Sequence, residues 1–411
     1  MIYVPFVFFL LLAIIIIKQR GLDASAYISL LYAISAFFSI LYYNDEATVL
    51  YKDACTFFPT VIYCGLISLA ILPVYKFNTA SLQRITMPNT VAIKGLTYLY
   101  FAIFVVLLFA YLDDLIFIFT FDDFAELRDD ISDGETFTTQ YSGLLGFILL
   151  IFNILATISF VMIPVFFMMV LSKQKWWLQI MAILGSLPIV IIGMLGIDRS
   201  KSFYWVIILG LSLVIFWRHL GQKTKKIVTV LVSLLLLGVL SYFGSVTSDR
   251  FEDTDSGVEG GVVSYAGQTY VNFCYFFENF NNGETFSTRY MFPAIHFWIL
   301  QDYEGAVALQ QDLDKHTGII TGVFYSFLGS FIVDNNQIGP FVYIGFYLVL
   351  FFICLRCKRN SEISLLNFFY FYCLSIVPTC GFILYIYTSP YMTISIMLIM
   401  LLIALTYLQK R

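Results

Sequence analysis

The sequence predicts an all-α, polytopic membrane protein, and two observations lead to this fold class. Hydrophobic residues make up 60% of the 411 residues and charged residues only 12%, whereas charged residues are about a quarter of a typical soluble domain. The apolar residues gather in runs of about 20, in which a helix satisfies every backbone hydrogen bond without water. The alternating pattern of a membrane β-barrel is absent. The seven cysteines, odd in number and mostly inside apolar runs, argue against a disulfide framework.

We expect about eleven membrane-spanning helices, each built on one apolar run. Their predicted bounds are 2–17, 25–43, 58–75, 96–119, 143–171, 178–197, 203–217, 227–246, 338–355, 363–386 and 390–408. No internal repeat divides the sequence, so we interpret residues 1–411 as a single integral membrane domain.

The distribution of Lys and Arg predicts the orientation of these helices, because short cytoplasmic loops carry an excess of both. Met1–Ile17 contains neither residue type, and Lys18 and Arg20 follow it, which predicts an external N-terminus. The same orientation leaves 16 of the 23 basic residues on the cytoplasmic side, with only Asp23 and Glu362 of the 27 acidic residues. The C-terminus is then expected in the cytoplasm.

One long polar segment, 247–337, is expected as an external loop that contains short helices. Its apolar stretch 319–333 is not expected to cross the membrane, because the basic cluster at 356–359 would then lie outside. We expect this stretch to be re-entrant or interfacial, with its backbone covered by protein or by a wet cavity. A second external segment, 120–142, is strongly acidic, so cations on this side are exceptions.

These exceptional cations are the candidates for anion binding. Arg199 and Lys201 lie in a tight polar hairpin between two apolar spans, where an ionisable residue is costly and indicates function. The planar fork of arginine suits phosphate oxygens. In the long loop, Arg289 has fewer neighbouring carboxylates than Arg250. The alternatives are headgroup contacts for the hairpin and a weak surface ion pair for Arg250.

Histidine suits general-base catalysis near neutral pH. His316 is the histidine in the most polar part of the long loop and is our candidate base, the alternative being an ordinary surface histidine. His296 lies in an apolar run and is expected to be packed or interfacial, and His219 is expected in the cytoplasm.

Aromatic and amide side chains interleave between Ser264 and Asn282. Aromatic faces and amide hydrogen bonds are what a neutral sugar binds, and the alternative is an amphipathic helix at the outer interface. The candidate sugar-binding residues are Tyr265, Gln268, Tyr270 and Asn272.

Several motifs are missing from the sequence. There is no Gly-rich phosphate loop with a lysine, no His/Cys metal spacing and no His-Glu pair on a helix. Nucleotide hydrolysis and zinc chemistry are therefore not expected, and we predict neither a cofactor nor a metal. We also predict no nucleic-acid partner.

The arrangement of the chain resembles the bacterial O-antigen and capsular oligosaccharide repeat unit polymerases. The likeness extends over nearly the whole chain and includes the hairpin Gly196–Lys201, the loop opening at Asp249–Phe251 and the stretch from Thr317 through Asp334 to Gly339. It implies a metal-independent membrane glycosyltransferase of the glycosyltransferase-C type. Such enzymes join undecaprenyl-diphosphate-linked oligosaccharides at the periplasmic face of the inner membrane.

The resemblance also implies roles for individual residues. Arg199 and Arg289, then Arg250, would stabilise the departing diphosphate, and His316 would act as base, with Asp249 or Asp334 as carboxylate substitutes. Lys201 joins the substrate-binding set with Asp249, Asp334 and the sugar-binding residues. The implied partners are the lipid-linked glycans, membrane lipids, a polysaccharide chain-length regulator and a flippase.

Two other functions stay open. O-antigen ligases share this layout, and their acceptor-side histidine motif is loosely matched by His316-Thr317. A flippase or other transporter of lipid-linked oligosaccharides would carry charges inside its spans and a clearer two-half organisation. Here the polar residues are concentrated in one external loop, which favours an enzyme.

Overall fold

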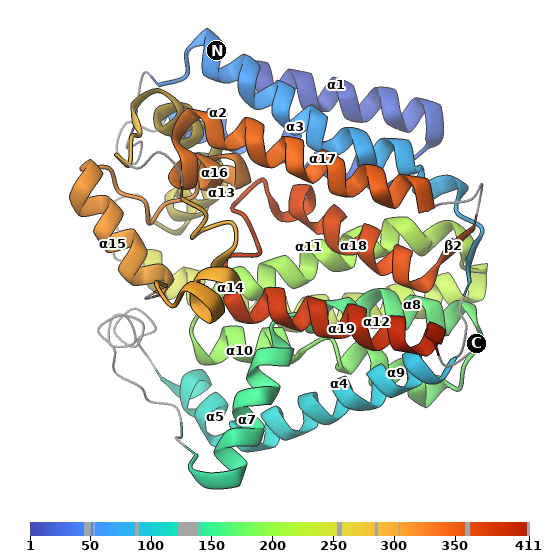
Figure 1. Ribbon diagram of the computed structural model, residues 1–411. Helices are drawn as coiled ribbons and strands as arrows, with labels where there is room; N and C mark the ends of the chain where they lie inside the picture. Colours follow the sequence, from blue (N-terminus) through green and yellow to red (C-terminus); the bar gives the residue numbers. More distant parts are fainter. Residues whose placement is uncertain are drawn as a thin grey trace. The chain divides into compact units, whose positions relative to one another are not determined.

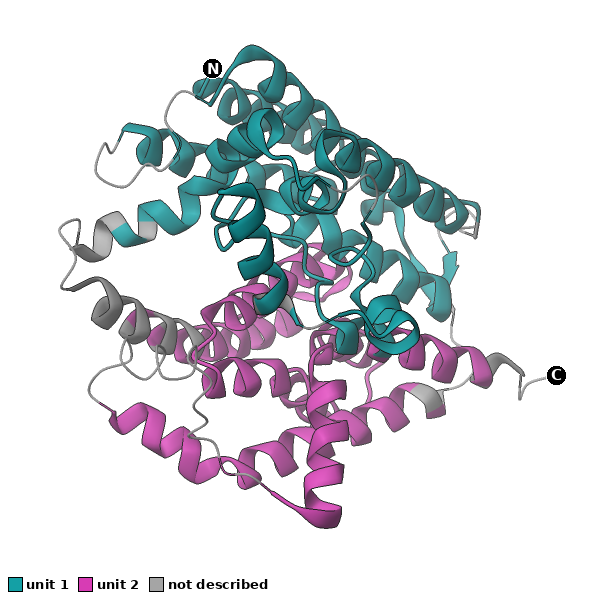
Figure 2. Cartoon of the chain, turned by 60° about the vertical axis from the view of Figure 1, so that its left-hand side comes forward, with its two compact units in different colours: residues 1–87, 259–394 teal, residues 88–258, 395–411 magenta. Residues whose placement is uncertain are grey.

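The computed structural model is helical, apart from one small two-stranded sheet (Figure 1). It describes residues 1–44, 51, 54–86, 90–121, 139, 141–252, 257–283, 287–303, 305–357 and 362–408. The chain forms two compact units (Figure 2). Unit 1 comprises Met1–Met87 and Glu259–Ile394, and unit 2 comprises Pro88–Val258 and Ser395–Arg411.

Unit 1 is built around four helices that run side by side: α1, α2, α3 and α17 (Figure 1). Buried aromatic rings from the first three meet in its core, where Phe9 contacts Tyr32 and Tyr63 at centroid distances of 5.4 and 6.2 Å. The elements of unit 1 are α1 (Tyr3–Arg20), α2 (Ala24–Asn44), α3 (Phe57–Phe77), η1 (Thr79–Ser81), β1 (Arg84–Thr86), α13 (Gly257–Asn279), α14 (Pro293–Ile295), η4 (His296–Leu300), α15 (Ala306–Thr317), α16 (Ser326–Asn335), η5 (Asn336–Ile338), α17 (Gly339–Cys357), β2 (Glu362–Ser364) and α18 (Leu365–Cys380).

Unit 2 has α4 at its centre, in contact with α7, α8, α9 and α10. The last helix, α19 (Pro390–Leu408), begins within the residues of unit 1 and ends within those of unit 2. The other elements of unit 2 are α4 (Thr90–Ala110), α5 (Leu112–Thr120), α7 (Gly143–Ala156), η2 (Ser159–Val161), α8 (Met162–Leu171), α9 (Trp176–Leu184), α10 (Pro188–Leu195), α11 (Arg199–Phe216), η3 (Trp217–His219) and α12 (Gln222–Glu252).

The polytopic membrane class is supported by helix length and composition. Among the described residues, seven helical segments are long and apolar enough to cross a membrane, or eight if the bent pair formed by 143–156 and 159–171 is one span. α1 shows the expected surface, since it exposes apolar side chains such as Val7 and Leu11. The finer count of eleven spans stays a prediction, because α18 and the apolar part of α19 are shorter than the other candidates.

Three predicted spans are interrupted in the structure. The run at 96–119 breaks at Tyr111, between α4 and α5, and the run at 143–171 bends by 57° between α7 and η2. The run at 178–197 breaks before Pro188, which has no backbone N–H to continue a helix. Conversely, α12 continues to Glu252, past the predicted end at 246. Apolar composition gives the extent of these runs but not their internal breaks.

In unit 1, basic helix ends and loops that are predicted on the cytoplasmic side contact one another. The Arg20 guanidinium at the end of α1 donates to the Tyr75 carbonyl at the end of α3 and covers the Tyr75 ring. β1 and β2 pair in parallel, with Arg84 opposite Glu362. These contacts agree with the prediction that both loops and the end of α1 share one side of the membrane.

α13 packs closely against α2 through a glycine. The backbone of Gly267 lies so near the Phe38 carbonyl that any β-carbon would collide with it. Beside this contact the Ser35 and Thr269 hydroxyls are 2.9 Å apart, and both side chains are buried. The helix is longer than the short helices expected in the 247–337 segment, and most of its second half is buried.

Gly267→Ala is therefore expected to destabilise unit 1 by about 1–3 kcal/mol, the usual cost of overpacking. The matched control is Gly345→Ala on α17, where an added β-carbon meets nothing within 4 Å. It should be neutral or slightly stabilising, because alanine favours helix more than glycine does. Melting temperatures of the two purified variants test this, and equal values would contradict the close α2–α13 packing.

The stretch predicted as re-entrant or interfacial, 319–333, becomes α16 after a short irregular segment. All ten residues of α16 are buried. Its first backbone N–H groups, from Ser326 and Phe327, donate to the carbonyls of Ile383 and Gly381 just beyond α18, at 2.8 Å each. The irregular backbone at this point is thus paired within the protein, as a membrane environment requires.

A sharp turn separates α16 from α17, although length and composition alone join 326–356 as one candidate span. The Phe331 and Tyr343 rings are 4.9 Å apart, whereas a straight helix would separate these positions by about 18 Å. Asn336 adopts a positive φ of 52° at the turn, and Gly339 lies too close to the Phe331 carbonyl for any side chain. This turn brings Asp334 and Tyr343 together.

Candidate functional site

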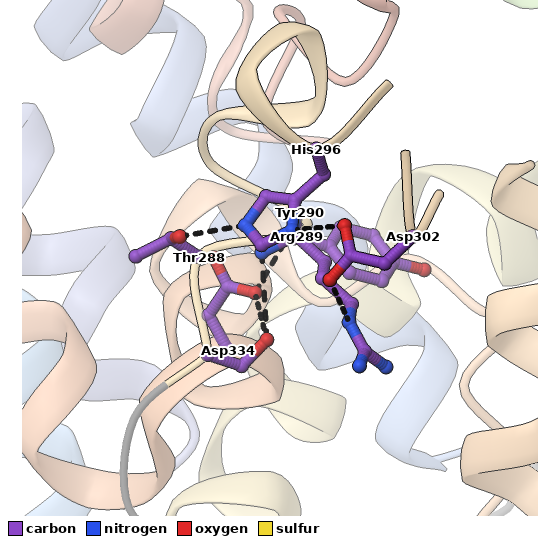
Figure 3. Close-up of polar contacts among 7 residues, drawn as sticks. Thr288, Arg289, Tyr290, His296, Asp302 and Asp334 are labelled. Atoms are coloured by element: carbon purple, nitrogen blue, oxygen red, sulfur yellow. Dashed lines mark hydrogen bonds and ion pairs between the residues drawn. The ribbon is translucent and has the colours of Figure 1, made fainter. Parts of the chain in front are cut away.

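The site is built on the segment between α13 and α15, which the end of α16 holds in place (Figure 3). The Asp334 carboxylate accepts the backbone N–H of Tyr290 at 2.9 Å and that of Met291 at 2.8 Å. The Tyr343 hydroxyl donates to the same carboxylate at 3.2 Å. Asp334 is only 1% exposed, so protein donors occupy both of its oxygens. It therefore fixes the two peptide groups that flank Tyr290.

Neighbouring amides reinforce this attachment. Asn335 accepts the Ser287 N–H at 3.2 Å and donates to the Ser287 carbonyl at 2.6 Å. Asn282 donates to the carbonyls of Val333 and Asp334 at 3.0 and 3.2 Å, which satisfies backbone groups at the end of α16. The segment is thus tied to α16 both before and after residues 284–286, which lie outside the described residues.

A hydrogen-bonded chain runs through Thr288, His296 and Asp302 (Figure 3). The Thr288 hydroxyl oxygen is 2.8 Å from His296 Nε2, and His296 Nδ1 is 2.8 Å from Asp302 Oδ1. A carboxylate only accepts, so Nδ1 carries the proton and Nε2 accepts from Thr288 in the neutral ring. This is the order of partners found in hydroxyl–imidazole–carboxylate catalytic groups.

An unusual backbone path brings Asp302 back to His296. His296–Leu300 forms one turn of π-helix, and Gln301 ends it with a left-handed φ of 56°. The Asp302 N–H then donates to the His296 carbonyl at 3.2 Å. Non-glycine residues with positive φ are uncommon, and π-helical turns are frequent at functional sites. The path places both the N–H and the carboxylate of Asp302 against His296.

Arg289 completes the cluster. Its Nε lies 4.0 Å from Asp302 Oδ2, and its side chain is 34% exposed. Figure 3 shows its terminal nitrogens directed away from the carboxylate. Beside it Tyr290 is buried, which raises the pKa of its phenol to about 12 and keeps it neutral. The cluster therefore presents one accessible cation next to a carboxylate that also orients a histidine.

Acidification is expected to loosen this segment. The hydrogen bond from His296, with help from Arg289, holds the pKa of Asp302 below its ordinary value. A lowered folded-state pKa contributes stability above the ordinary value, about 3.9, and the contribution is lost as pH falls through the folded value. Hydrogen exchange of 296–303, corrected for intrinsic rates, should accelerate below about pH 4 in the wild type. Asp302→Asn should exchange fast at every pH, and identical pH dependence in both proteins would contradict the tether.

The hairpin that carries Arg199 and Lys201 lies in unit 2. It connects α10 and α11 in three residues, and Asp198 caps α11 by accepting the Ser200 N–H at 2.9 Å. Lys201 Nζ lies 3.5 Å from Asp198 Oδ2. Arg199, in the first turn of α11, is only 8% exposed. Arg199 and Arg289 belong to different units, and the predicted role of the hairpin cations stays a prediction.

The four candidate sugar-binding residues lie on α13 in unit 1, and three of them are buried. Tyr270 is 0% exposed, and its hydroxyl is 2.6 Å from the Thr60 hydroxyl. Asn272 donates to Gln268 Oε1 at 3.2 Å and to the Phe324 carbonyl at 2.9 Å. Tyr265 is partly exposed and meets the Phe324 ring edge-on at 5.3 Å. The described partners of this set are protein groups, and its sugar-binding role stays a prediction.

The remaining sequence candidates lie apart from the cluster or outside the described side chains. His316 is exposed on α15, where Nδ1 contacts the Asp312 carbonyl oxygen at 2.8 Å and its carboxylate at 3.2 Å. Asp249 and Arg250 lie in the last turns of α12, but their side chains are outside the described residues. Most of the acidic segment 120–142 is also outside them.

The sequence predicts Arg289 and Asp334 as candidates but does not predict Thr288, His296 and Asp302 as a group, and the structure places these three beside Arg289. His296 was expected to be packed or interfacial, and it is indeed buried at 7% exposure. The sequence did contain a sign of a hydroxyl–imidazole–carboxylate group, because a threonine lies eight residues before this histidine and an aspartate six residues after it.

The cluster thus joins an accessible guanidinium to a hydroxyl–imidazole–carboxylate chain in a membrane protein. Among the described residues, no three His, Cys, Asp or Glu side chains gather as a metal-binding group. No family model, no curated protein and no solved structure matches this chain.

Proposed function

We propose that this chain is a membrane glycosyltransferase that joins lipid-diphosphate-linked oligosaccharide repeat units into a polymer. The observation that carries the proposal is the Arg289 guanidinium, partly exposed beside Asp302 on a segment that Asp334 holds rigidly. Its position in a chain with many membrane-spanning helices favours an anionic substrate carried on a lipid.

The reaction needs a cation where a diphosphate departs. The oxygen of an acceptor sugar hydroxyl bonds to the anomeric carbon of the donor, and the bond from that carbon to the phosphate oxygen breaks. The electron pair of the broken bond goes to the diphosphate, whose negative charge grows in the transition state. A guanidinium binds such oxygens through two parallel hydrogen bonds. Arg289 suits this role because its terminal nitrogens are directed away from Asp302 (Figure 3).

The cellular setting follows from the charge distribution. The excess of Lys and Arg on the opposite side favours an external, periplasmic position for the 287–303 segment in a bacterial inner membrane. The proposed substrates are undecaprenyl-diphosphate-linked glycans, and a flippase and a chain-length regulator are the proposed functional partners.

Complementation of a strain lacking the gene tests the activity against its two alternatives. A polymerase restores long surface glycan, and its loss leaves single repeat units at the surface. If the chain is a ligase, its loss leaves polymer on the lipid carrier and none on lipid A. If it is a flippase, its loss leaves no repeat unit outside. Either of the last two patterns would overturn the proposal.

A further inference from the structure

We propose that Thr288, His296 and Asp302 form a proton relay that deprotonates the acceptor hydroxyl, with the Thr288 hydroxyl as the group that meets the substrate. This inference rests on the proposed glycosyl transfer and assigns its base. It replaces the sequence-based candidate His316, whose described contacts stay within α15.

Exposure determines the order of the relay. His296 has a side chain only 9% exposed, so a bulky sugar has little access to its ring. Thr288 is partly exposed, and its hydroxyl is within 2.8 Å of Nε2. The substrate hydroxyl therefore gives its proton to Thr288 Oγ1 while Thr288 passes its own proton to His296 Nε2. The new glycosidic bond forms as the anomeric bond to the diphosphate breaks, so atoms and charge balance.

Asp302 contacts both the proposed base, His296, and the proposed anion-binding cation, Arg289. Through Oδ1 it fixes the His296 tautomer that leaves Nε2 free of a proton, and through Oδ2 it contacts Arg289. Its carboxylate also stabilises the imidazolium formed when the relay operates. Because one carboxylate orients both groups, the base and the anion-binding cation have a fixed spacing.

The charged and titratable side chains near His296 come from several elements of unit 1. Asp302 lies in direct contact, Arg289 lies beyond it, and Asp334 on α16 interacts with the ring electrostatically. Among nearby tyrosines, Tyr290 lies in the same cluster, and Tyr303 and Tyr391 both contact the ring of Phe297, the residue after His296. Two nearby carboxylates against one arginine favour the imidazolium that the relay produces.

The test is the rate of polymer formation by the purified protein, given a lipid-diphosphate-linked repeat unit as donor and acceptor. General-base catalysis contributes about 10²- to 10⁴-fold, so Thr288→Val should lower kcat at least about 100-fold. Thr288→Ser retains a hydroxyl and should stay within about fivefold of wild type. His296→Gln should lower kcat similarly and change the pH–rate profile, because it removes the base that the relay uses. His219→Gln, on η3, is the matched control.

Melting temperatures accompany each rate, so that a folding defect is recognised. If Thr288→Val does not fold, the His296→Gln pH profile and a solvent deuterium isotope effect on the wild type decide the matter. The relay is overturned if Thr288→Val and His296→Gln both retain wild-type kcat and pH profile. It is also overturned if Thr288→Ser is as slow as Thr288→Val. A wild-type protein that forms no polymer would instead refute the proposed function itself.

Discussion

Replacing Arg289 with alanine is expected to abolish polymer while single lipid-linked repeat units still reach the cell surface. Removing one transition-state donor typically costs 10²- to 10³-fold in rate, and a guanidinium facing a diphosphate is such a donor. Arg289→Lys should recover a minor part of the rate, because an ammonium supplies charge without the planar fork. Surface glycan is read on gels, and initial rates are measured with purified protein.

Arg84→Ala is the matched control for this experiment. Arg84 also lies in unit 1 and faces a carboxylate, Glu362, at 3.9 Å, but its side chain is 72% exposed. A surface pair of this kind is worth little, so polymer length and rate should not change. Wild-type polymer in Arg289→Ala, at equal protein level, would eliminate Arg289 as the anion contact.

The substitution Asp334→Asn should damage both stability and activity. One of the two carboxylate oxygens becomes an NH₂ group, which then opposes a backbone N–H of Tyr290 or Met291 instead of accepting from it. A buried donor left without an acceptor costs about 1–3 kcal/mol, so the unfolding free energy should fall by roughly this amount. Polymer should also be lost, because the segment that carries Arg289 is no longer fixed. Melting temperature and polymerisation rate are measured on the same preparation.

The two readouts separate positioning from chemistry. Arg289→Ala should lose activity at an unchanged melting temperature, whereas Asp334→Asn should lose both. Asp113→Asn, at an exposed aspartate in the first turn of α5, controls for removal of a carboxylate. If Asp334→Asn melts like the wild type, then the carboxylate does not hold this segment.

The sharp turn between α16 and α17 explains why a buried carboxylate is tolerated at Asp334. The turn at Asn336–Ile338 folds Tyr343 back onto α16. There its hydroxyl also accepts a hydrogen bond from the Asn335 amide at 2.8 Å. Buried charge is costly unless hydrogen bonds satisfy it. Here two backbone N–H groups and a phenol do so, and in return the 287–291 backbone is fixed.

Part of this site was predictable from local sequence. Arg289 differs from Arg250 in having few acidic neighbours, and Asp334 lies at the end of an apolar stretch, where a carboxylate is conspicuous. His296 was not distinguishable from a packed histidine, because its apolar neighbours describe its burial and not its partners. The aromatic and amide pattern at 264–282 fits a sugar surface and a buried helix equally well. Only the tertiary contacts show that both side chains face protein, since Tyr270 reaches Thr60 on α3 and Asn272 reaches the Phe324 carbonyl.

By itself, the sequence determined the membrane class, predicted which basic ends share one side and gave Arg289 as an anion-binding candidate. These depend on composition, on run length and on charges close in the chain. The tertiary structure decided that Asp334 holds the backbone of residues 43 and 44 positions away, and that His296 joins Thr288 to Asp302. Backbone turns with positive φ accompany these contacts, at Gln301 between His296 and Asp302 and at Asn336 directly after α16. Glutamine does not announce such a turn, because at Gln301 the uncommon conformation is stabilised by surrounding contacts and not by local preference.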